Sequence, residues 1–164
     1  MDSVMIVICS LIVIGTFLLW EFVAWFTHKY IMHGFLWIWH KSHHTMHDHT
    51  LEKNDWFAVV FSIPSIALFY FGSVATRNPY IISVGIGILC YGIFYLVFHD
   101  VIVHQRLKWR PLKKSQYLKR MINAHYVHHS KHSKEDCEAF GFLIAQKKYE
   151  PRSFEFKSER KETQ

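Results

Sequence analysis

Long apolar runs without charge alternate with densely charged segments along this chain. Residues 4–20, 56–75 and 80–98 contain no Lys, Arg, Asp or Glu, and apolar residues resume after Glu21 and continue to Phe26. A helix needs about 20 mostly apolar residues to cross the hydrocarbon of a bilayer. The pattern therefore predicts an all-α integral membrane protein with three to four transmembrane helices and a polar part outside the bilayer.

A short connection of turn-forming residues, Thr-Arg-Asn-Pro at positions 76–79, joins the second and third apolar runs. It predicts that these two runs form an antiparallel hairpin. The chain then crosses the membrane twice between His49 and His99. The histidine-rich segments on either side of the hairpin are therefore expected to emerge at the same membrane face.

Basic residues are distributed unequally between the two expected membrane faces. The face without histidines carries the N-terminus and Arg77, whereas the histidine face carries the basic C-terminal third and Lys29, Lys41 and Lys53. Positively charged loops usually remain in the cytoplasm. We therefore expect a cytosolic, histidine-rich helical cap, a cytoplasmic C-terminus and an external N-terminus. The basic region is expected to contact anionic lipid, and not nucleic acid.

The chain beyond the third run is too polar to cross the membrane again. Apolar residues recur near helical spacing between positions 112 and 125, which is typical of an amphipathic helix at the membrane interface. The apolar run at 139–145 is too short to span and is expected to dip into the interface or to cover a site. We expect one membrane-embedded domain over residues 1–148 and a charged, mobile tail over residues 149–164.

The N-terminal segment and the cysteines exclude two other kinds of structure. The first apolar run lacks the basic start and the small-residue cleavage site of a signal peptide, so it is expected to remain as an anchor. Cys9, Cys90 and Cys137 lie far apart and no C-x-x-C sequence occurs. Neither a disulfide framework nor a zinc finger is therefore indicated.

Ten of the chain's thirteen histidines fall into four motifs. Spacings of three and four residues place side chains on one face of an α-helix, so each H-x-x-H-H motif is expected to present three imidazoles toward one point. A spacing of five residues is about 140° apart on an α-helix, so each H-x-x-x-x-H pair either straddles a metal or lies where the helix distorts on leaving the membrane. The motifs comprise His28, His33, His40, His43, His44, His99, His104, His125, His128 and His129.

Ten imidazoles exceed the six ligands of an octahedral ion and suit two metal ions held close together. Imidazole is a good ligand for iron, zinc, copper and nickel. No Glu-x-x-His sequence occurs, so the carboxylate-rich di-iron site of ferritin-like bundles is excluded. His47, His49 and His132 lie outside the motifs, where a histidine is more often incidental than a ligand.

Three polar residues near the motifs are candidates for orienting the ligands. Asp100 follows His99 directly and either holds a histidine ring by a hydrogen bond or is a solvated interfacial charge. Glu21 lies two helical turns before His28, where a carboxylate within a span either faces the bundle interior with a role there or extends its charged end toward the membrane surface. Asn123 is a weaker candidate. We assign no catalytic residue beyond the metal ligands.

These histidine stretches resemble the bacterial β-carotene hydroxylases, non-haem di-iron enzymes of the fatty acid hydroxylase and desaturase superfamily. The resemblance extends from His28 to about Leu143 and is carried by residues 28–44, 99–106, 117–130 and 140–143. It implies that all ten motif histidines bind two iron ions, which zinc can replace in purified or crystallised material. It also implies O₂-dependent hydroxylation of β-ionone rings at C3, taking β-carotene through β-cryptoxanthin to zeaxanthin.

The resemblance and the sequence together suggest where substrate and electrons come from. An insoluble hydrocarbon is best taken directly from the bilayer, and span aromatics such as Trp25, Phe69 and Phe94 either line a channel or, more commonly, serve in packing. No dinucleotide-binding fingerprint occurs, so electrons must come from an external donor. A ferredoxin-type carrier is expected on the basic face near residues 106–119, although lipid contact also explains that charge. The absence of a plastid transit sequence indicates a multi-pass protein of the bacterial inner membrane.

Other functions remain open from the sequence alone. The same chemistry is compatible with a fatty-acid or sterol hydroxylase or a desaturase. A non-enzymatic membrane metal-binding protein, such as a transporter, a sensor or a zinc-stabilised scaffold, is a further alternative. A transporter is disfavoured because no histidine lies in the middle of a span. The sequence leaves undetermined which histidines share an ion, the oligomeric state and the acceptance of ketolated carotenoids.

Overall fold

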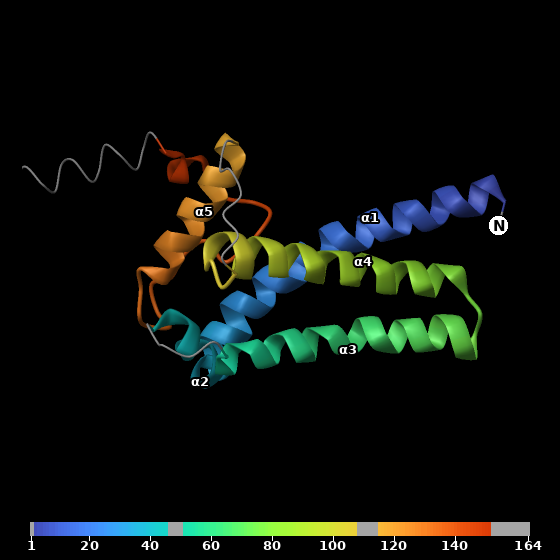
Figure 1. Ribbon diagram of the computed structural model, residues 1–164, viewed down its shortest axis with the longest axis horizontal. Helices are drawn as coiled ribbons and strands as arrows, with labels where there is room; N and C mark the ends of the chain where they lie inside the picture. Colours follow the sequence, from blue (N-terminus) through green and yellow to red (C-terminus); the bar gives the residue numbers. More distant parts are fainter. Residues whose placement is uncertain (1, 46–50, 108–114, 152–164) are drawn as a thin grey trace, which may run out of the picture.

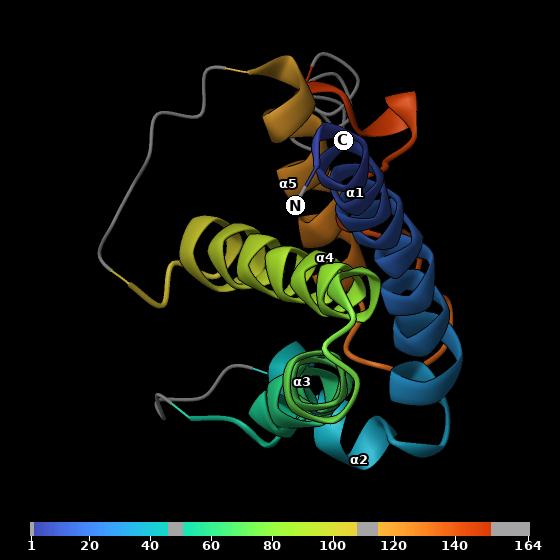
Figure 2. The same cartoon turned by 90° about the vertical axis from the view of Figure 1, so that its right-hand side faces the viewer.

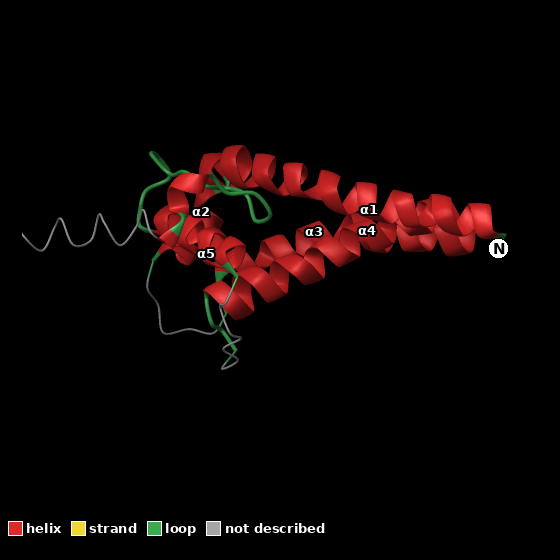
Figure 3. Cartoon of the chain, turned by 90° about the horizontal axis from the view of Figure 1, so that it is seen from above, coloured by secondary structure: helices red, strands yellow, loops and turns green. Residues whose placement is uncertain are grey.

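The computed structural model describes residues 2–45, 51–107 and 115–151, and in these ranges it contains helices and loops but no strand (Figures 1 and 3). The all-α fold class predicted from the sequence is confirmed. His47 and His49 lie outside the described residues. The labelled helices are α1 (Ser3–Phe26), α2 (Trp37–His40), α3 (Trp56–Tyr70), α4 (Pro79–Tyr95) and α5 (Gln116–His129).

Three helical stretches in the described chain are long and apolar enough to cross a membrane, namely Ser3–Phe35, Lys53–Ala75 and Pro79–Val103. They are longer than α1, α3 and α4 because each of these helices continues without a break into a π-helical segment. The count agrees with the lower end of the predicted range of three to four. The π-helical segments are Thr27–Phe35, Phe71–Ala75 and Leu96–Val103.

Helix α4 packs against both α1 and α3 (Figure 2). The connection at residues 76–79 joins the second and third spans as predicted. The Asn78 side chain accepts a hydrogen bond from the Tyr80 N–H, and Pro79 begins α4. Within the resulting antiparallel hairpin, the buried Ser65 hydroxyl donates to the carbonyl of Gly85, 2.9 Å away. Hydroxyl groups of this kind commonly join transmembrane helices.

Gly87 sets the distance between α1 and α4. A Cβ atom built at this position would lie 2.6 Å from the Thr16 Cβ and 2.8 Å from the Val13 carbonyl oxygen. We expect Gly87→Ala to force the helices apart and to lower the free energy of unfolding by about 1–3 kcal/mol, the usual cost of overpacking. Thermal unfolding in detergent measures this effect. Gly15→Ala on α1 is the control, because a Cβ there meets nothing within 4 Å; an equal Tm for the two variants would contradict the prediction.

The remaining elements form a cap at one end of the long helices. In Figures 1 and 3, α2 and α5 lie at the end of the molecule opposite the N-terminus. The apolar core of the cap joins the end of the third span to α5, and it comprises Phe98, Val103, Met121, Ile122 and Phe142. The amphipathic helix expected near residues 112–125 is α5. Its apolar face packs inside the cap, on the same side as the buried His125 and His128.

Two residues beyond the expected boundary at residue 148 still contact α5. Tyr149 is 4% exposed, and its carbonyl accepts a hydrogen bond from the Asn123 amide. Arg120 pairs with Glu150 at 3.2 Å. Residues 152–164 lie outside the described part of the chain, and the mobile tail stays a prediction.

Candidate metal centre

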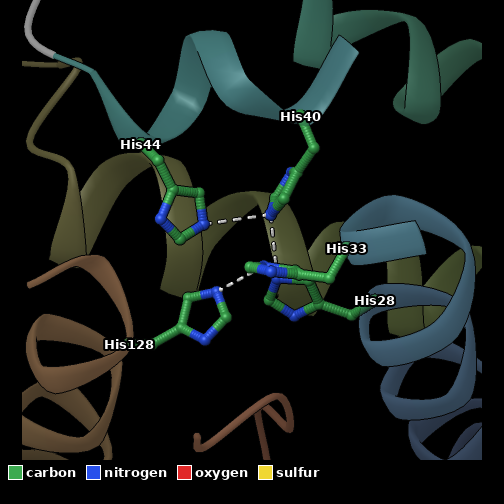
Figure 4. Close-up of side chains that lie close together, drawn as sticks. All are labelled: His28, His33, His40, His44 and His128. Atoms are coloured by element: carbon green, nitrogen blue, oxygen red, sulfur yellow. Dashed lines mark hydrogen bonds between the residues drawn. The ribbon is translucent and has the colours of Figure 1, made fainter. Parts of the chain in front are cut away.

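The ten motif histidines lie together in the cap, as two groups of five. Within each group, one ring nitrogen from every residue lies within 4.8 Å of those of the other four. Figure 4 shows the rings of the first group pointing toward a common centre. The first group is His28, His33, His40, His44 and His128, and the second group is His43, His99, His104, His125 and His129.

The π-helical ends of the spans explain the pairs separated by five residues. In a π-helix the hydrogen bonds join residues i and i+5, which brings side chains at this spacing toward one face. The His104 N–H donates to the carbonyl of His99 in this manner, at 2.9 Å. The ring centroids are 5.2 Å apart for His28 and His33, and 4.5 Å apart for His99 and His104. Of the two alternatives left open by the sequence, the distorted helix is the one observed.

The H-x-x-H-H motifs do not each point toward one centre, contrary to expectation. His40 and His44 belong to the first group, whereas His43 belongs to the second. The reason is local: α2 tightens into a 3-10 turn at Lys41–His44, which turns consecutive side chains to different sides. The second motif also divides, although it lies on the regular α-helix α5: one of its residues belongs to the first group and two belong to the second. Each motif therefore joins the two groups.

The outer nitrogens of the first group all meet oxygen atoms. The Nδ1 of His40 lies 2.7 Å from the Asn54 Oδ1. The other four Nδ1 atoms lie 2.9–3.2 Å from main-chain carbonyls of a single segment, residues 131–140. A carbonyl oxygen can only accept, so each Nδ1 carries the proton and each Nε2 directs a lone pair inward. The four carbonyl partners belong to Lys131 for His44, Lys134 for His33, Glu138 for His128 and Phe140 for His28.

These inward nitrogens lie against one another, an arrangement that a bound cation would stabilise. The Nε2 of His40 is 3.1 Å from the Nε2 of His28 and 3.2 Å from that of His44. Two unprotonated nitrogens at this distance share no proton. Protonation does not remove the conflict near neutral pH, because burial lowers the pKa of His44 to about 4 and holds the pKa of His40 and His128 well below the ordinary value. The donor set therefore fits a metal ion.

The second group has carboxylates as its outer partners. The His43 Nδ1 lies 3.1 Å from Glu52, the His99 Nδ1 lies 2.8 Å from Asp100, and the Nε2 atoms of these two histidines are 2.8 Å apart. The same conflict between inward lone pairs arises as in the first group. In addition, the buried Nε2 of His129 has no hydrogen-bond partner among the described residues. An unpartnered buried nitrogen of this kind is suited to a metal ligand.

Arg106 compensates the carboxylates around the second group. Its guanidinium donates to Glu52 at 2.5 Å and to Asp55 at 2.7 Å, and its Nε lies 3.9 Å from Asp100. Burial lowers the pKa of the neighbouring His104 to about 3, which keeps this ring neutral and able to bind metal. The second group is thus surrounded by charged partners, whereas the first is surrounded by neutral ones.

The structure distributes the other candidate residues differently. The Asp100 carboxylate contacts the Nδ1 of His99, which corresponds to the first of the two interpretations of this residue from the sequence. Glu21 and Asn123 do not hydrogen-bond a histidine: Glu21 accepts from Tyr91 and from two main-chain amides, and Asn123 donates to Tyr149. His132 hydrogen-bonds the carbonyl of His44 at 2.7 Å. Sequence reasoning missed Glu52 and Asn54, for which the available signal was a polar cluster directly before the second span.

An apolar cavity of about 480 Å³ connects the three spans to both histidine groups. His28 and His40 of the first group and His99 of the second lie in its wall. Of the span aromatics considered from the sequence, Phe69 lines it, whereas Trp25 stacks on Phe22 and Phe94 on Phe98. The cavity is otherwise lined mainly by apolar side chains, among them Trp20, Phe57, Phe61, Ile88 and Phe142.

Comparison with known proteins agrees with this architecture. The β-carotene hydroxylase of Paracoccus sp. (strain PC1) is 43% identical over 136 residues, which cover 82% of this chain and 83% of that protein. The β-carotene hydroxylase of Pseudescherichia vulneris is 44% identical over 139 residues, covering 84% and 77%. A chloroplastic β-carotene hydroxylase of Capsicum annuum is 33% identical, covering 79% of this chain and 41% of its own length. No solved structure matches significantly. The model of the fatty acid hydroxylase family matches residues 13–146, and the chain therefore belongs to this family.

Proposed function

We propose that this protein is a β-carotene 3-hydroxylase, which converts β-carotene through β-cryptoxanthin to zeaxanthin in the inner membrane of a bacterium. The observation that carries the proposal is the apolar cavity, whose wall contains histidines of both groups. A hydrocarbon that enters from the bilayer reaches this wall without meeting water. The names of the bacterial relatives supply the substrate.

The two histidine groups each bind one iron ion in this proposal, with the ten motif histidines as ligands. The inward lone pairs and the unpartnered His129 Nε2 support it. Nitrogen ligands of this type also accept zinc, so zinc can occupy purified material. Bound iron would supply the oxidising chemistry, in which O₂, two electrons and two protons convert a C–H bond into C–OH with water as the second product.

The protein's own side chains position and insulate this reaction. The outer hydrogen bonds hold all five rings of the first group, and His43 and His99 of the second, at a fixed angle, because a ring tied at Nδ1 cannot turn its Nε2 away from the centre. Phe142 lies against His28, His99 and His125, with ring centroids 5.6–5.9 Å apart, and fills the space between the two groups at the cavity wall. The apolar walls hold the substrate ring and exclude water.

Orientation and electron supply form the second part of the proposal. The histidine cap and the C-terminus lie in the cytoplasm and the N-terminus outside, supported by the excess of lysine on the cap side. Electrons come from a ferredoxin-type carrier, since the chain has no dinucleotide-binding fingerprint. The exposed Lys131 and Lys147 and the half-buried Lys119 offer an acidic carrier a docking surface on the cap.

Pigment analysis in a bacterium that already makes β-carotene tests the proposed reaction. Expression of the chain is expected to produce β-cryptoxanthin and zeaxanthin, while the same strain with an empty vector keeps β-carotene alone. If the metal-loaded protein accumulates and neither product forms, the proposal is overturned. That result would favour a fatty-acid or sterol hydroxylase, a desaturase or a non-enzymatic metal-binding protein.

Asn54 provides a test of the first histidine group. Asn54→Leu removes the oxygen that holds the His40 Nδ1, so we expect the metal affinity of this group to fall about tenfold. Asn54→Asp is the matched control, because it keeps an acceptor oxygen at the same place. Metal content after dialysis against a graded series of chelator concentrations measures the difference. Equal metal retention in the two variants would show that the outer contact has no such role.

Gly92 provides a test of the cavity. It lines the cavity, and a Cβ built on it meets nothing within 4 Å, so a larger side chain can enter the open space. We expect Gly92→Phe to fill part of the cavity and to weaken productive substrate binding by about 1 kcal/mol, or about fivefold in kcat/KM, with metal content unchanged. Gly15→Phe is the control, since Gly15 has equal room but does not line the cavity. Equal turnover in both variants would argue against substrate binding here.

A further inference from the structure

Glu21 is a buried carboxylate inside the first membrane span, and it is 7% exposed. Its Oε2 accepts a hydrogen bond from the Tyr91 hydroxyl at 2.6 Å. Its Oε1 accepts from the main-chain N–H groups of Phe142 and Leu143, at 2.8 and 2.9 Å. An ionisable group at this depth is costly to bury, so a carboxylate with three donors has a specific role there.

The two amides belong to a segment that reaches the metal centre at two points. The carbonyl of Phe140 holds the Nδ1 of His28 at 2.9 Å. The ring of Phe142 stacks on the same histidine with an interplanar angle of 9°, and it also contacts His99 of the second group. One short stretch of main chain thus orients a ring of the first group and packs against both groups.

Gly141 allows the carboxylate to approach this stretch. A Cβ built at position 141 would lie 2.7 Å from the Glu21 Oε1. Glycine at this position therefore matches the close contact between α1 and the segment. On the other side, the Tyr117 hydroxyl donates to the Leu143 carbonyl at 2.6 Å, which ties the segment to α5.

We propose that Glu21 is a positioning residue for the metal centre. Its carboxylate fixes the main chain at Phe142 and Leu143, and this contact holds the Phe140 carbonyl on His28 and the Phe142 ring between the two histidine groups. The inference uses the metal-binding part of the proposed function and is independent of the carotenoid substrate. It assigns Glu21 neither a ligand role nor a proton-transfer role.

Two substitutions of Glu21 separate positioning from charge. Glu21→Gln is expected to preserve the arrangement, because its carbonyl can accept from both amides and its NH₂ group can donate to the Tyr91 hydroxyl oxygen. Glu21→Leu removes every acceptor and is expected to lower the metal affinity of the first group about tenfold, within the usual range for a lost outer contact. Metal per chain after chelator dialysis and the absorption spectrum of the cobalt-substituted protein measure both variants. Glu21→Asp, which withdraws the carboxylate by one methylene, replaces Glu21→Leu if the latter is not recovered from membranes.

Gly87→Ala is the control for general damage, because it disturbs the packing of α1 on α4 away from the segment. It is expected to retain metal and the cobalt spectrum of the unmodified protein. The proposal is overturned if Glu21→Leu keeps full metal affinity, if Glu21→Gln loses as much as Glu21→Leu, or if Gly87→Ala shows the same loss. None of these readouts needs carotenoid turnover, so they stand apart from a failure of the proposed reaction.

Discussion

Alanine at His40 or at His99 is expected to reduce zeaxanthin formation more than about 100-fold, because loss of a ligand should exceed the 10- to 100-fold cost of losing its outer partner. The Nε2 of His40 contacts two other inward nitrogens of the first group, those of His28 and His44. The Nε2 of His99 makes the shortest inward contact of the second group. Both rings are 2% exposed, so water cannot easily replace them. Pigment analysis in a β-carotene-producing bacterium measures the effect.

Metal content gives a second, independent readout for the same variants. Because the residues belong to different groups, each variant is expected to retain about one of the two ions. His132→Ala is the matched control: His132 lies in neither group, although its ring contacts the His44 carbonyl. Full hydroxylation by His40→Ala or His99→Ala would refute the assignment of the groups as the metal centre.

Removal of the Arg106 guanidinium is expected to destabilise the second group more than removal of any one of the three carboxylates that it contacts. Arg106→Met removes the guanidinium contact of Glu52, which is 8% exposed, and that of Asp55. Breaking a fully buried pair costs about 3–5 kcal/mol; since Arg106 is 21% exposed, we expect about 2 kcal/mol. The displaced Glu52 no longer holds His43, and metal affinity is expected to fall at least tenfold.

Thermal unfolding in detergent and chelator dialysis measure this variant. Arg120→Met is the matched control, because Arg120 is equally shielded at 22% exposed but pairs with Glu150, which is 47% exposed and remote from the histidines. We expect a change in stability within about 1 kcal/mol and full metal content for the control. Unchanged metal affinity in Arg106→Met would show that the carboxylates hold their histidines without it.

The membrane part of the fold could be predicted because bilayer thickness imposes one rule on the whole chain. Residues 4–26, 56–75 and 80–98 are apolar over the necessary length, and the turn before Pro79 determines the hairpin. That hairpin alone brings His43 and His99 to the same end of the molecule. The convergence of the ten histidines therefore follows from counting membrane crossings, before any side-chain geometry is considered.

The division of the histidines into two groups could not be predicted from spacing, because it depends on helix type at one motif and on the placement of the whole helix at the other: His125 and His128 lie on the regular α-helix α5 and still belong to different groups. A regular α-helix would place His40, His43 and His44 on one face, whereas the observed 3-10 turn separates His43 from its neighbours. The π-helical segment at Leu96–Val103 has the opposite effect and brings His99 and His104 together. Helix type at a span end is decided by tertiary contacts and is not encoded in the apolar pattern.

The outer partners were still less accessible to sequence reasoning. Carbonyl groups carry no side-chain signal, so nothing in residues 131–140 indicates that four of them meet histidine rings. For Glu21 the sequence left an interior role and snorkelling open, and it did not indicate that the partners are Tyr91 and two main-chain amides. Most of these pairings join positions 87 to 122 residues apart and depend on a loop path that no local pattern specifies.

The carbonyl contacts made by residues 131–140 affect how this segment can evolve. A main-chain oxygen is present whatever the side chain, so most substitutions in this segment leave the four acceptors in place. An insertion or deletion shifts every carbonyl after it out of register with its ring. The first histidine group therefore constrains the number of residues in the segment 131–139 far more strongly than the identity of their side chains.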